Sequence, residues 1–216
     1  ADVDLSIANA NEVIGSLTST VLPKILKKYD SISFSLEGEQ QEQGENLKSL
    51  GKNFILAMIV VYMLLAIPFK SYFQPLVVMS SIPFGITGAV VGHIIMGMNL
   101  SVLSMMGIVA LTGVVVNDSL VMVDFINRYR SEGNTIKKAV LEAGPRRFRP
   151  IFLTSLTTFV GLVPLILEKS TQAKFIIPMA VSLSFGVLFA TAITLLLVPV
   201  SYITLEKYIL KTEKNK

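Results

Sequence analysis

Charged residues are absent from four long stretches of this chain, and no other feature restricts its fold more. No Asp, Glu, Lys or Arg occurs between Lys52 and Lys70, Lys70 and Asp118, Arg149 and Glu168, or Lys174 and Glu206. Each stretch can hold at least one helix of roughly 17 to 25 apolar residues, the length that crosses a bilayer. With 52% hydrophobic and only 16% charged residues, the composition indicates a membrane protein.

Five spans are predicted, and they account for nearly all of the apolar sequence. They cover about residues 54–69, ending at Pro68; 74–96, with a kink at Pro83; 101–126; 150–167; and 175–205. A basic connector over 127–149 separates the third and fourth spans, and its middle, 135–143, is typical of a short amphipathic surface helix ending at Gly144-Pro145. The fold class is therefore an all-α polytopic bundle of five transmembrane helices.

Residues 1–50 are polar and form a different kind of segment. Alternation favours strands at 3–7 and 31–36, helical spacing favours a helix over 11–28, and the charged stretch 37–50 is helical and continues into the first span. We expect a short α+β fragment here. It has no basic and apolar start of the kind that marks a signal peptide, so we expect a piece of a longer chain.

The distribution of Lys and Arg predicts the orientation. Seven basic residues lie in the connector: Arg128, Arg130, Lys137, Lys138, Arg146, Arg147 and Arg149. Four more, Lys207, Lys211, Lys214 and Lys216, lie in the tail over 207–216. Both segments are expected in the cytoplasm, which leaves residues 1–50 outside it, in a periplasm.

Several function classes are disfavoured. The net charge of +4 comes from residues that flank apolar runs, which favours membrane contact over nucleic acid. The chain has no cysteine, and His93 is its only histidine, so we expect no metal site and no disulfide. P-loop, GxGxxG, HExxH and GxSxG motifs are absent, so nothing favours an enzyme or an ATP-driven pump.

Two polar residues, Asn117 and Asp118, lie inside the apolar third span. A carboxylate there is expensive to keep ionised, so Asp118 should pair, meet water or take up a proton. Asp118 is therefore a candidate proton carrier, with a structural hydrogen bond to a neighbouring helix as the alternative. Asp124 is expected to form an i,i+4 ion pair with Arg128.

Other polar and small residues favour structural roles. Four hydroxyls open the fourth span (Thr154, Ser155, Thr157 and Thr158), where they can relay protons or bond to carbonyls of their own helix. His93 is expected to be structural. Gly85, Gly88 and Gly92, of which the last two form GxxxG, together with Gly107 and Gly113, indicate close helix packing.

The chain resembles a known family in several specific segments. They are GIVALTGVVVNDSLVMVDFINRYRSEG, GPRRFRPIFLTSLTTFVGLVPLIL, MAVSLSFGVLFATAITLLLVPV and IPFKSYFQPLVVMSSIPFGITGAVVGH, with SFSLEGEQQEQ near the N-terminus. Together they are similar to the C-terminal transmembrane half of the resistance-nodulation-division efflux pumps. The resemblance implies helices eight to twelve of a twelve-helix inner-membrane protein, preceded by the end of a periplasmic porter subdomain. It also implies a homotrimer working with a periplasmic adaptor and an outer-membrane channel, without a cofactor and driven by the proton-motive force.

The resemblance also implies site residues. In the family, an aspartate pair of the N-terminal half faces a lysine on the tenth helix, near a threonine and an arginine on the eleventh. The threonine corresponds to Thr154 and the arginine to Arg147, but the lysine position holds Asn117, which carries no charge. Asp118 then becomes an additional protonatable group, because GVVVNDS resembles the aspartate motif of the family's other half.

Multidrug or other amphiphile export is the favoured function. A metal-ion or lipid exporter of the same superfamily is the nearest alternative, although the nine Met residues form no evident ladder. A membrane scaffold or sensor would leave Asp118 dispensable, and an intramembrane enzyme would need a second catalytic group beside it.

Overall fold

The computed structural model describes residues 13, 15–27 and 39–214, and the chain divides into two compact units, Ala1–Gly44 and Glu45–Lys216. In the first unit a π-helical turn, Leu17–Val21, leads into α2, Leu22–Leu26. Pro23 is tolerated in the first turn of α2, where its missing N–H has no partner to lose. This agrees with the helix predicted over 11–28, whereas the predicted strands at 3–7 and 31–36 lie outside the described residues.

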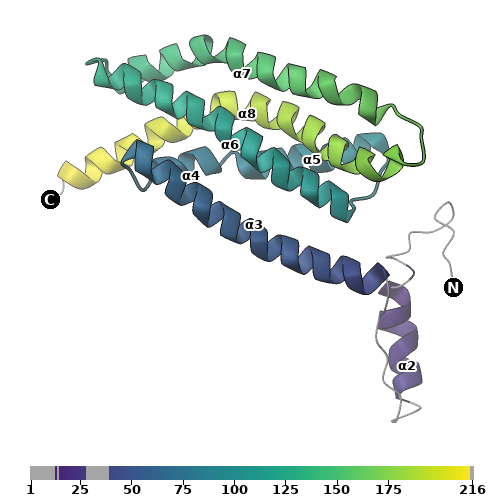
Figure 1. Cartoon of the computed structure of the whole chain (residues 1–216). Helices are drawn as coiled ribbons and strands as arrows, with labels where there is room; N and C mark the ends of the chain where they lie inside the picture. Colours follow the sequence, from purple (N-terminus) through teal and green to yellow (C-terminus); the bar gives the residue numbers. More distant parts are fainter. Residues whose placement is uncertain (1–12, 14, 28–38, 215–216) are drawn as a thin grey trace. The chain divides into compact units, whose positions relative to one another are not determined.

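The remaining described elements are all helices, drawn in Figure 1. They are α3 (Glu39–Phe69), α4 (Gln74–Met79), α5 (Ile82–Met96), α6 (Val102–Ser131), α7 (Ile136–Ile166) and α8 (Ala173–Lys214). Five segments are long and apolar enough to cross a membrane: 44–69, 74–96, 102–131, 136–166 and 173–205. The five predicted spans are confirmed, and the charged stretch before the first one is continuous with it in α3.

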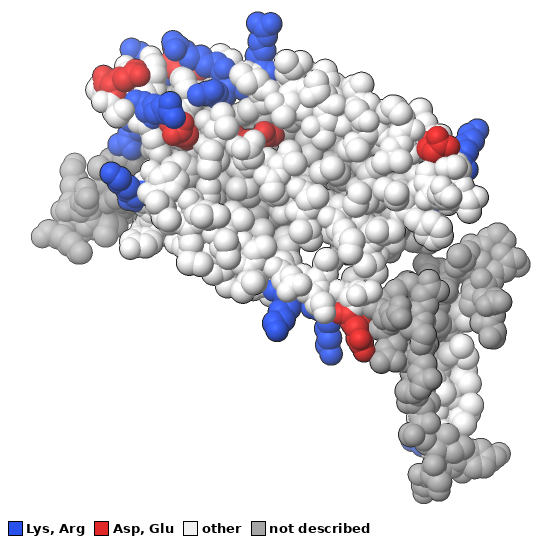
Figure 2. Space-filling view, in the orientation of Figure 1, with Lys and Arg blue, Asp and Glu red and all other residues white. Residues whose placement is uncertain are grey.

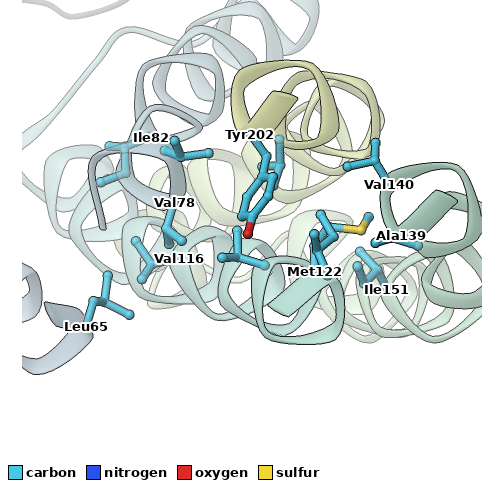
Figure 3. Close-up of a cluster of buried hydrophobic side chains, with 14 residues drawn as sticks. Leu65, Val78, Ile82, Val116, Met122, Ala139, Val140, Ile151 and Tyr202 are labelled. Carbon is cyan, nitrogen blue, oxygen red and sulfur yellow. The ribbon is translucent and has the colours of Figure 1, made fainter. Parts of the chain in front are cut away.

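Helix α8 is central to the bundle, because it packs against α5, α6 and α7. The largest apolar cluster lies where α4, α6, α7 and α8 meet, and Figure 3 shows the Tyr202 ring of α8 among Val78 of α4, Met122 of α6 and Val140 of α7. Tyr202 and Met122 are almost completely buried. This cluster fixes the positions of α6 and α8 relative to each other.

The second span is broken between α4 and α5, close to the predicted kink at Pro83. Ser80 and Ser81 separate the two helices, and Pro83 lies in the first turn of α5. Pro83 has no N–H to donate to the Met79 carbonyl, so the helical hydrogen-bond ladder stops there.

The prediction of a separate surface helix ending at Gly144-Pro145 is wrong. Helix α7 runs without interruption from Ile136 to Ile166 through Pro145, Pro150 and Pro164. Burial of Ala139 and Ala143 against the main cluster holds its first turns in line with the span. Each proline frees the carbonyl four residues earlier, and the first two of these belong to exposed residues, Leu141 and Arg146, where other donors can reach them.

Apart from Asp118, the charged residues of the bundle lie near its ends. Figure 2 shows Lys and Arg gathered where α6 leads into α7, with a nearly uncharged face beyond them. We call this the basic end, comprising the seven connector residues from Arg128 to Arg149 named above. The distribution is that of an integral membrane protein.

Candidate functional site

The candidate site is built on the middle of α6. A capping box holds the first turn of this helix, because the Ser101 hydroxyl accepts from the Ser104 backbone N–H at 3.2 Å while Ser104 Oγ accepts from the Ser101 N–H at 3.0 Å. Asp118 follows in the middle of the 30-residue helix.

Asn117 and Asp118 point in different directions although they are neighbours in sequence. Successive residues of an α-helix are about 100° apart around its axis, since a turn has about 3.6 residues. Asn117 is exposed, whereas Asp118 is only 6% exposed. Asp118 therefore belongs to the buried face of α6, and Asn117 to its exposed face.

The Asp118 carboxylate has no protein partner within the described part of the chain. Neither a hydrogen bond nor an ion pair joins it to any residue that the structure describes. Its neighbours on the same face of α6, Val115 and Met122, are buried and apolar. This leaves a polar group in a largely apolar interior, a costly arrangement for the charged form.

The other predicted acid, Asp124, forms the expected ion pair. Its carboxylate lies 2.9 Å from Arg128 Nε one turn later on α6. Both side chains are well exposed, so the pair adds little to stability.

Arg147 is directed to the basic end of α6, not to Asp118. Its guanidinium lies 4.9 Å from the centre of the Phe125 ring, a cation–π contact. Its Nε is buried and makes no hydrogen bond to any described residue. Phe125 is seven positions after Asp118, which is roughly 10 Å along the helix axis.

The hydroxyls at the start of the fourth span mostly bond to their own helix. Thr154 donates to the Pro150 carbonyl at 2.9 Å, and Thr157 and Thr158 each donate to the Thr154 carbonyl. Thr154 is exposed, so the structure does not bring it to Asp118. Ser155 differs, because it is buried and also bonds to Thr191 of α8.

The structure adds polar contacts whose partners could not be identified from the sequence. Next to Asp118, Ser119 shares a hydrogen bond of 2.8 Å with Ser81, the residue that precedes α5. At the basic end, Gln74 and Asn127 exchange two amide hydrogen bonds across 53 positions. A polar residue at a buried helical position was the available signal, but no spacing rule identifies its partner.

His93 has the structural role that the sequence predicts. It is 2% exposed, and its ring nitrogens lie 2.9 Å from the Ala89 carbonyl oxygen and 2.8 Å from Ser104 Oγ. Both nitrogens are occupied by protein groups, and among the described residues no group of three His, Cys, Asp or Glu could hold a metal.

Glycines allow α5 and α6 to approach their neighbours closely. A Cβ atom on Gly92 would clash with the Phe185 side chain of α8, one on Gly88 with Phe189, and one on Gly85 would touch Val115 and Leu111 of α6. Gly107 likewise lies against α8. Gly113 was grouped with these by sequence, but no described atom lies within 4 Å of its Cβ position, since it faces away from the bundle.

A family model described as "AcrB/AcrD/AcrF family" matches residues 3–206. The chain belongs to this family. It is thus a resistance-nodulation-division permease segment, as the resemblance implied.

The relatives of this chain have names that describe different functions. The chain is 31% identical over 96% of its length to the swarming motility protein SwrC of Bacillus subtilis. It is 36% identical over 68% to the cobalt-zinc-cadmium resistance protein CzcA of Cupriavidus metallidurans, and 31% identical over 95% to the multidrug resistance protein MdtC of Erwinia tasmaniensis. The chain spans only 20%, 14% and 19% of these proteins, respectively.

The family fold is also found in solved structures. A crystal structure of a heavy metal efflux pump superposes on 90% of the chain with a TM-score of 0.75 at 24% identity, the chain covering 19% of that protein. At this identity the likeness establishes the arrangement of the helices and no more.

Proposed function

We propose that the chain is the C-terminal transmembrane segment of a proton-driven efflux transporter, a secondary antiporter in the inner membrane of a bacterium. Family membership supports transport across a membrane, and the names of CzcA and MdtC describe resistance and efflux-type functions. Positive residues at the basic end favour its placement in the cytoplasm, with the N-terminal segment in the periplasm.

The observation that carries proton coupling is the carboxylate of the buried residue Asp118, which has no hydrogen-bond or ion-pair partner among the residues that the structure describes. An ionised carboxylate without a partner is expensive inside a membrane protein, whereas the protonated acid is not. Movement of a proton on and off Asp118 therefore changes the free energy of the helix packing around it. Such a change can drive a conformational cycle without ATP or another cofactor.

Exposed small and polar residues on α6 and α7 support contact with the rest of the transporter. Gly113 and Asn117 form an exposed stripe on α6, and Thr154, Thr157 and Gly161 form one on α7. Small and polar side chains at mid-membrane level are typical of helix–helix interfaces and not of lipid contact. We propose that these stripes face the N-terminal half, where the family's aspartate pair would meet Asn117, Thr154 and Arg147.

The substrate class that we favour is a hydrophobe or amphiphile, as in multidrug export. The likeness to SwrC and MdtC extends over nearly the whole chain, whereas that to CzcA covers 68% of it. Met96 and Met106 are exposed on different helices and form no ladder for a soft metal ion. A homotrimer with an adaptor and an outer-membrane channel is the assembly expected for such a pump.

Dye efflux from cells that express the full-length transporter tests the proposal. We expect efflux to stop with a protonophore and to fall by roughly a hundredfold, the scale of a lost proton-transfer group, in Asp118→Asn. Asp124→Asn is the matched control, because it alters the same residue type on the same helix but only an exposed ion pair.

If the Asp118→Asn variant, present in the membrane at the same level as the wild type, exported dye at the wild-type rate, Asp118 would have no role in proton coupling. Protection against cobalt or zinc with no efflux of dye would instead show that the substrate class is wrong while leaving the coupling intact.

A further inference from the structure

Two buried residues of the bundle have polar groups with no partner among the described residues and lie at nearly the same level of α6 and α8. One is the Asp118 carboxylate of α6. The other is the Thr194 hydroxyl of α8, which is 1% exposed and makes no hydrogen bond to any residue that the structure describes. Buried hydroxyls of this kind are uncommon, since nearly all find an acceptor or a water molecule.

The register between α6 and α8 places these groups together. Three contacts along the two helices join Gly107 to Ser182, Leu111 to Gly186 and Asn127 to Tyr202. In each pair the residue of α8 comes 75 positions after its neighbour on α6. The same offset places Thr194 level with Ser119, one position from Asp118.

The two residues also lie on the faces by which the helices pack. On α6, Asp118 lies between Val115 and Met122, and on α8, Thr194 lies between Ala190 and Val198. Val115 and Ala190 belong to one buried cluster. Met122 and Val198 belong to the next. Asp118 and Thr194 therefore occupy the polar layer between two apolar layers of the same interface.

No charged side chain of the surrounding helices competes for Asp118. Helix α8 has none from Phe175 to Leu205, α4 has none, and the ionisable residue of α5, His93, is bound at the far end of α6. On α7 the nearest is Arg147, which stacks on Phe125, and on α6 it is Asp124, which pairs with Arg128.

We propose that Thr194 holds a water molecule against the Asp118 carboxyl group, so that Asp118 exchanges its proton through the α6–α8 interface and not through the face that carries Asn117. Unsatisfied buried polar groups from two elements are the usual partners of an internal water. When Asp118 is deprotonated, the water accepts the proton of its O–H and releases one of its own protons to bulk water. Thr194 can donate to that water or accept from it, so it is a positioning residue.

Thr191, one turn earlier on α8, provides a matched comparison. The Thr191 and Ser155 hydroxyls share a hydrogen bond of 2.5 Å, and Ser155 Oγ also lies 3.0 Å from the Ile151 carbonyl oxygen. The Thr191 hydroxyl is thus already used in joining α7 to α8. Both threonines are buried, and only Thr194 is without a partner among the described residues.

The test is the pH dependence of efflux by the full-length transporter in proteoliposomes, with Thr194→Val, Thr194→Ser and Thr191→Val. Valine keeps the shape of threonine without its hydroxyl, and serine keeps the hydroxyl without the methyl group. We expect Thr194→Val to lower efflux roughly tenfold, the scale of one hydrogen bond to a charged group, and to move the pH of half-maximal rate. Thr194→Ser should restore both, and Thr191→Val should leave the pH of half-maximal rate unchanged.

A merely structural Thr194 gives the opposite pattern. Thr194→Val would then behave like the wild type and Thr194→Ser would be the weaker protein, which overturns the proposal. Thr194→Ala is a second hydroxyl-free variant if Thr194→Val does not reach the membrane. The inference rests on the proposed function, and the Asp118→Asn variant distinguishes failure of one from failure of the other. If Asp118→Asn loses efflux while Thr194→Val is normal, only the role of Thr194 is rejected. If Asp118→Asn keeps efflux, the roles of Asp118 and Thr194 are both rejected.

Discussion

The hydroxyl of Tyr202 on α8 donates to Asn127 Oδ1 on α6 over 2.7 Å and joins the two helices at the basic end. Asn127 also exchanges two hydrogen bonds with Gln74 of α4, and Arg130 Nη1 donates to the Tyr202 oxygen at 3.1 Å. Three helices are thus tied together by side-chain bonds where the charged residues gather. The contact also belongs to the register between α6 and α8 that places Thr194 at nearly the same level as Asp118.

Tyr202→Phe tests this tie. The substitution keeps the buried ring but removes the hydroxyl, so we expect a loss of about 1 kcal/mol in the free energy of unfolding, the scale of an interhelical hydrogen bond in a membrane protein. Thermal unfolding of the detergent-solubilised transporter measures it. Tyr72→Phe is the control, since Tyr72 is 78% exposed. Equal stability of Tyr202→Phe and the control would show that the network contributes nothing.

Gly107→Ala tests a close approach of α6 to the backbone of α8. A Cβ atom at this position would lie 2.6 Å from the Met179 carbonyl oxygen, so the backbone of α8 has to move. We expect a destabilisation of about 1–3 kcal/mol. In Gly51→Ala the new methyl group meets no described atom, so that variant should unfold like the wild type or slightly later. A harmless Gly107→Ala would contradict the packing described here.

Asn117→Ala separates folding from transport. Because Asn117 is exposed on this bundle, its loss should change the free energy of unfolding by no more than about 0.5 kcal/mol. If its face meets the N-terminal half, efflux should nevertheless decrease. Purified protein yield and dye efflux from the same cells give the two values. Unchanged efflux would indicate that the polar stripe of α6 has no part in coupling.

His93→Leu should lower stability without changing the pH dependence of transport. The substitution removes the contacts of the buried ring with the Ala89 carbonyl oxygen and Ser104 Oγ, so we expect a loss of about 1–3 kcal/mol of stability. The pH profile of efflux, measured on the protein that still folds, should stay that of the wild type. A shifted profile would show that His93 takes part in proton transfer.

The span pattern was predictable because it depends on local sequence alone. Uncharged stretches between Lys52 and Glu206 gave all five membrane helices, and the Asp124–Arg128 pair followed from its i,i+4 spacing. The error at Gly144-Pro145 has a tertiary cause. Burial of Ala139 and Ala143 against the main cluster favours a continuous α7 by more than the interruption of the hydrogen-bond ladder at each proline costs.

The candidate site was predictable in part. A carboxylate within an apolar run singled out Asp118, but sequence could not show that Asp118 faces inward while Asn117 faces outward. It also ranked Gly113 with Gly107, although only Gly107 touches a neighbouring helix. The face that a residue presents depends on how the whole helix is rotated in the bundle, and that rotation is fixed by packing.

By itself, the sequence determined that the chain crosses a bilayer, where each span lies and which carboxylate is the costly one, because hydrophobicity and charge act on each residue through its immediate chain neighbours. Only the tertiary structure decided which groups share a layer: Thr194 with Asp118, Ser119 with Ser81, and Tyr202 with Asn127 and Gln74. The residues of α6 and α8 in these layers are 75 or 76 positions apart in the chain, and they share a level because close-packed helices have one register in which their apolar surfaces fit.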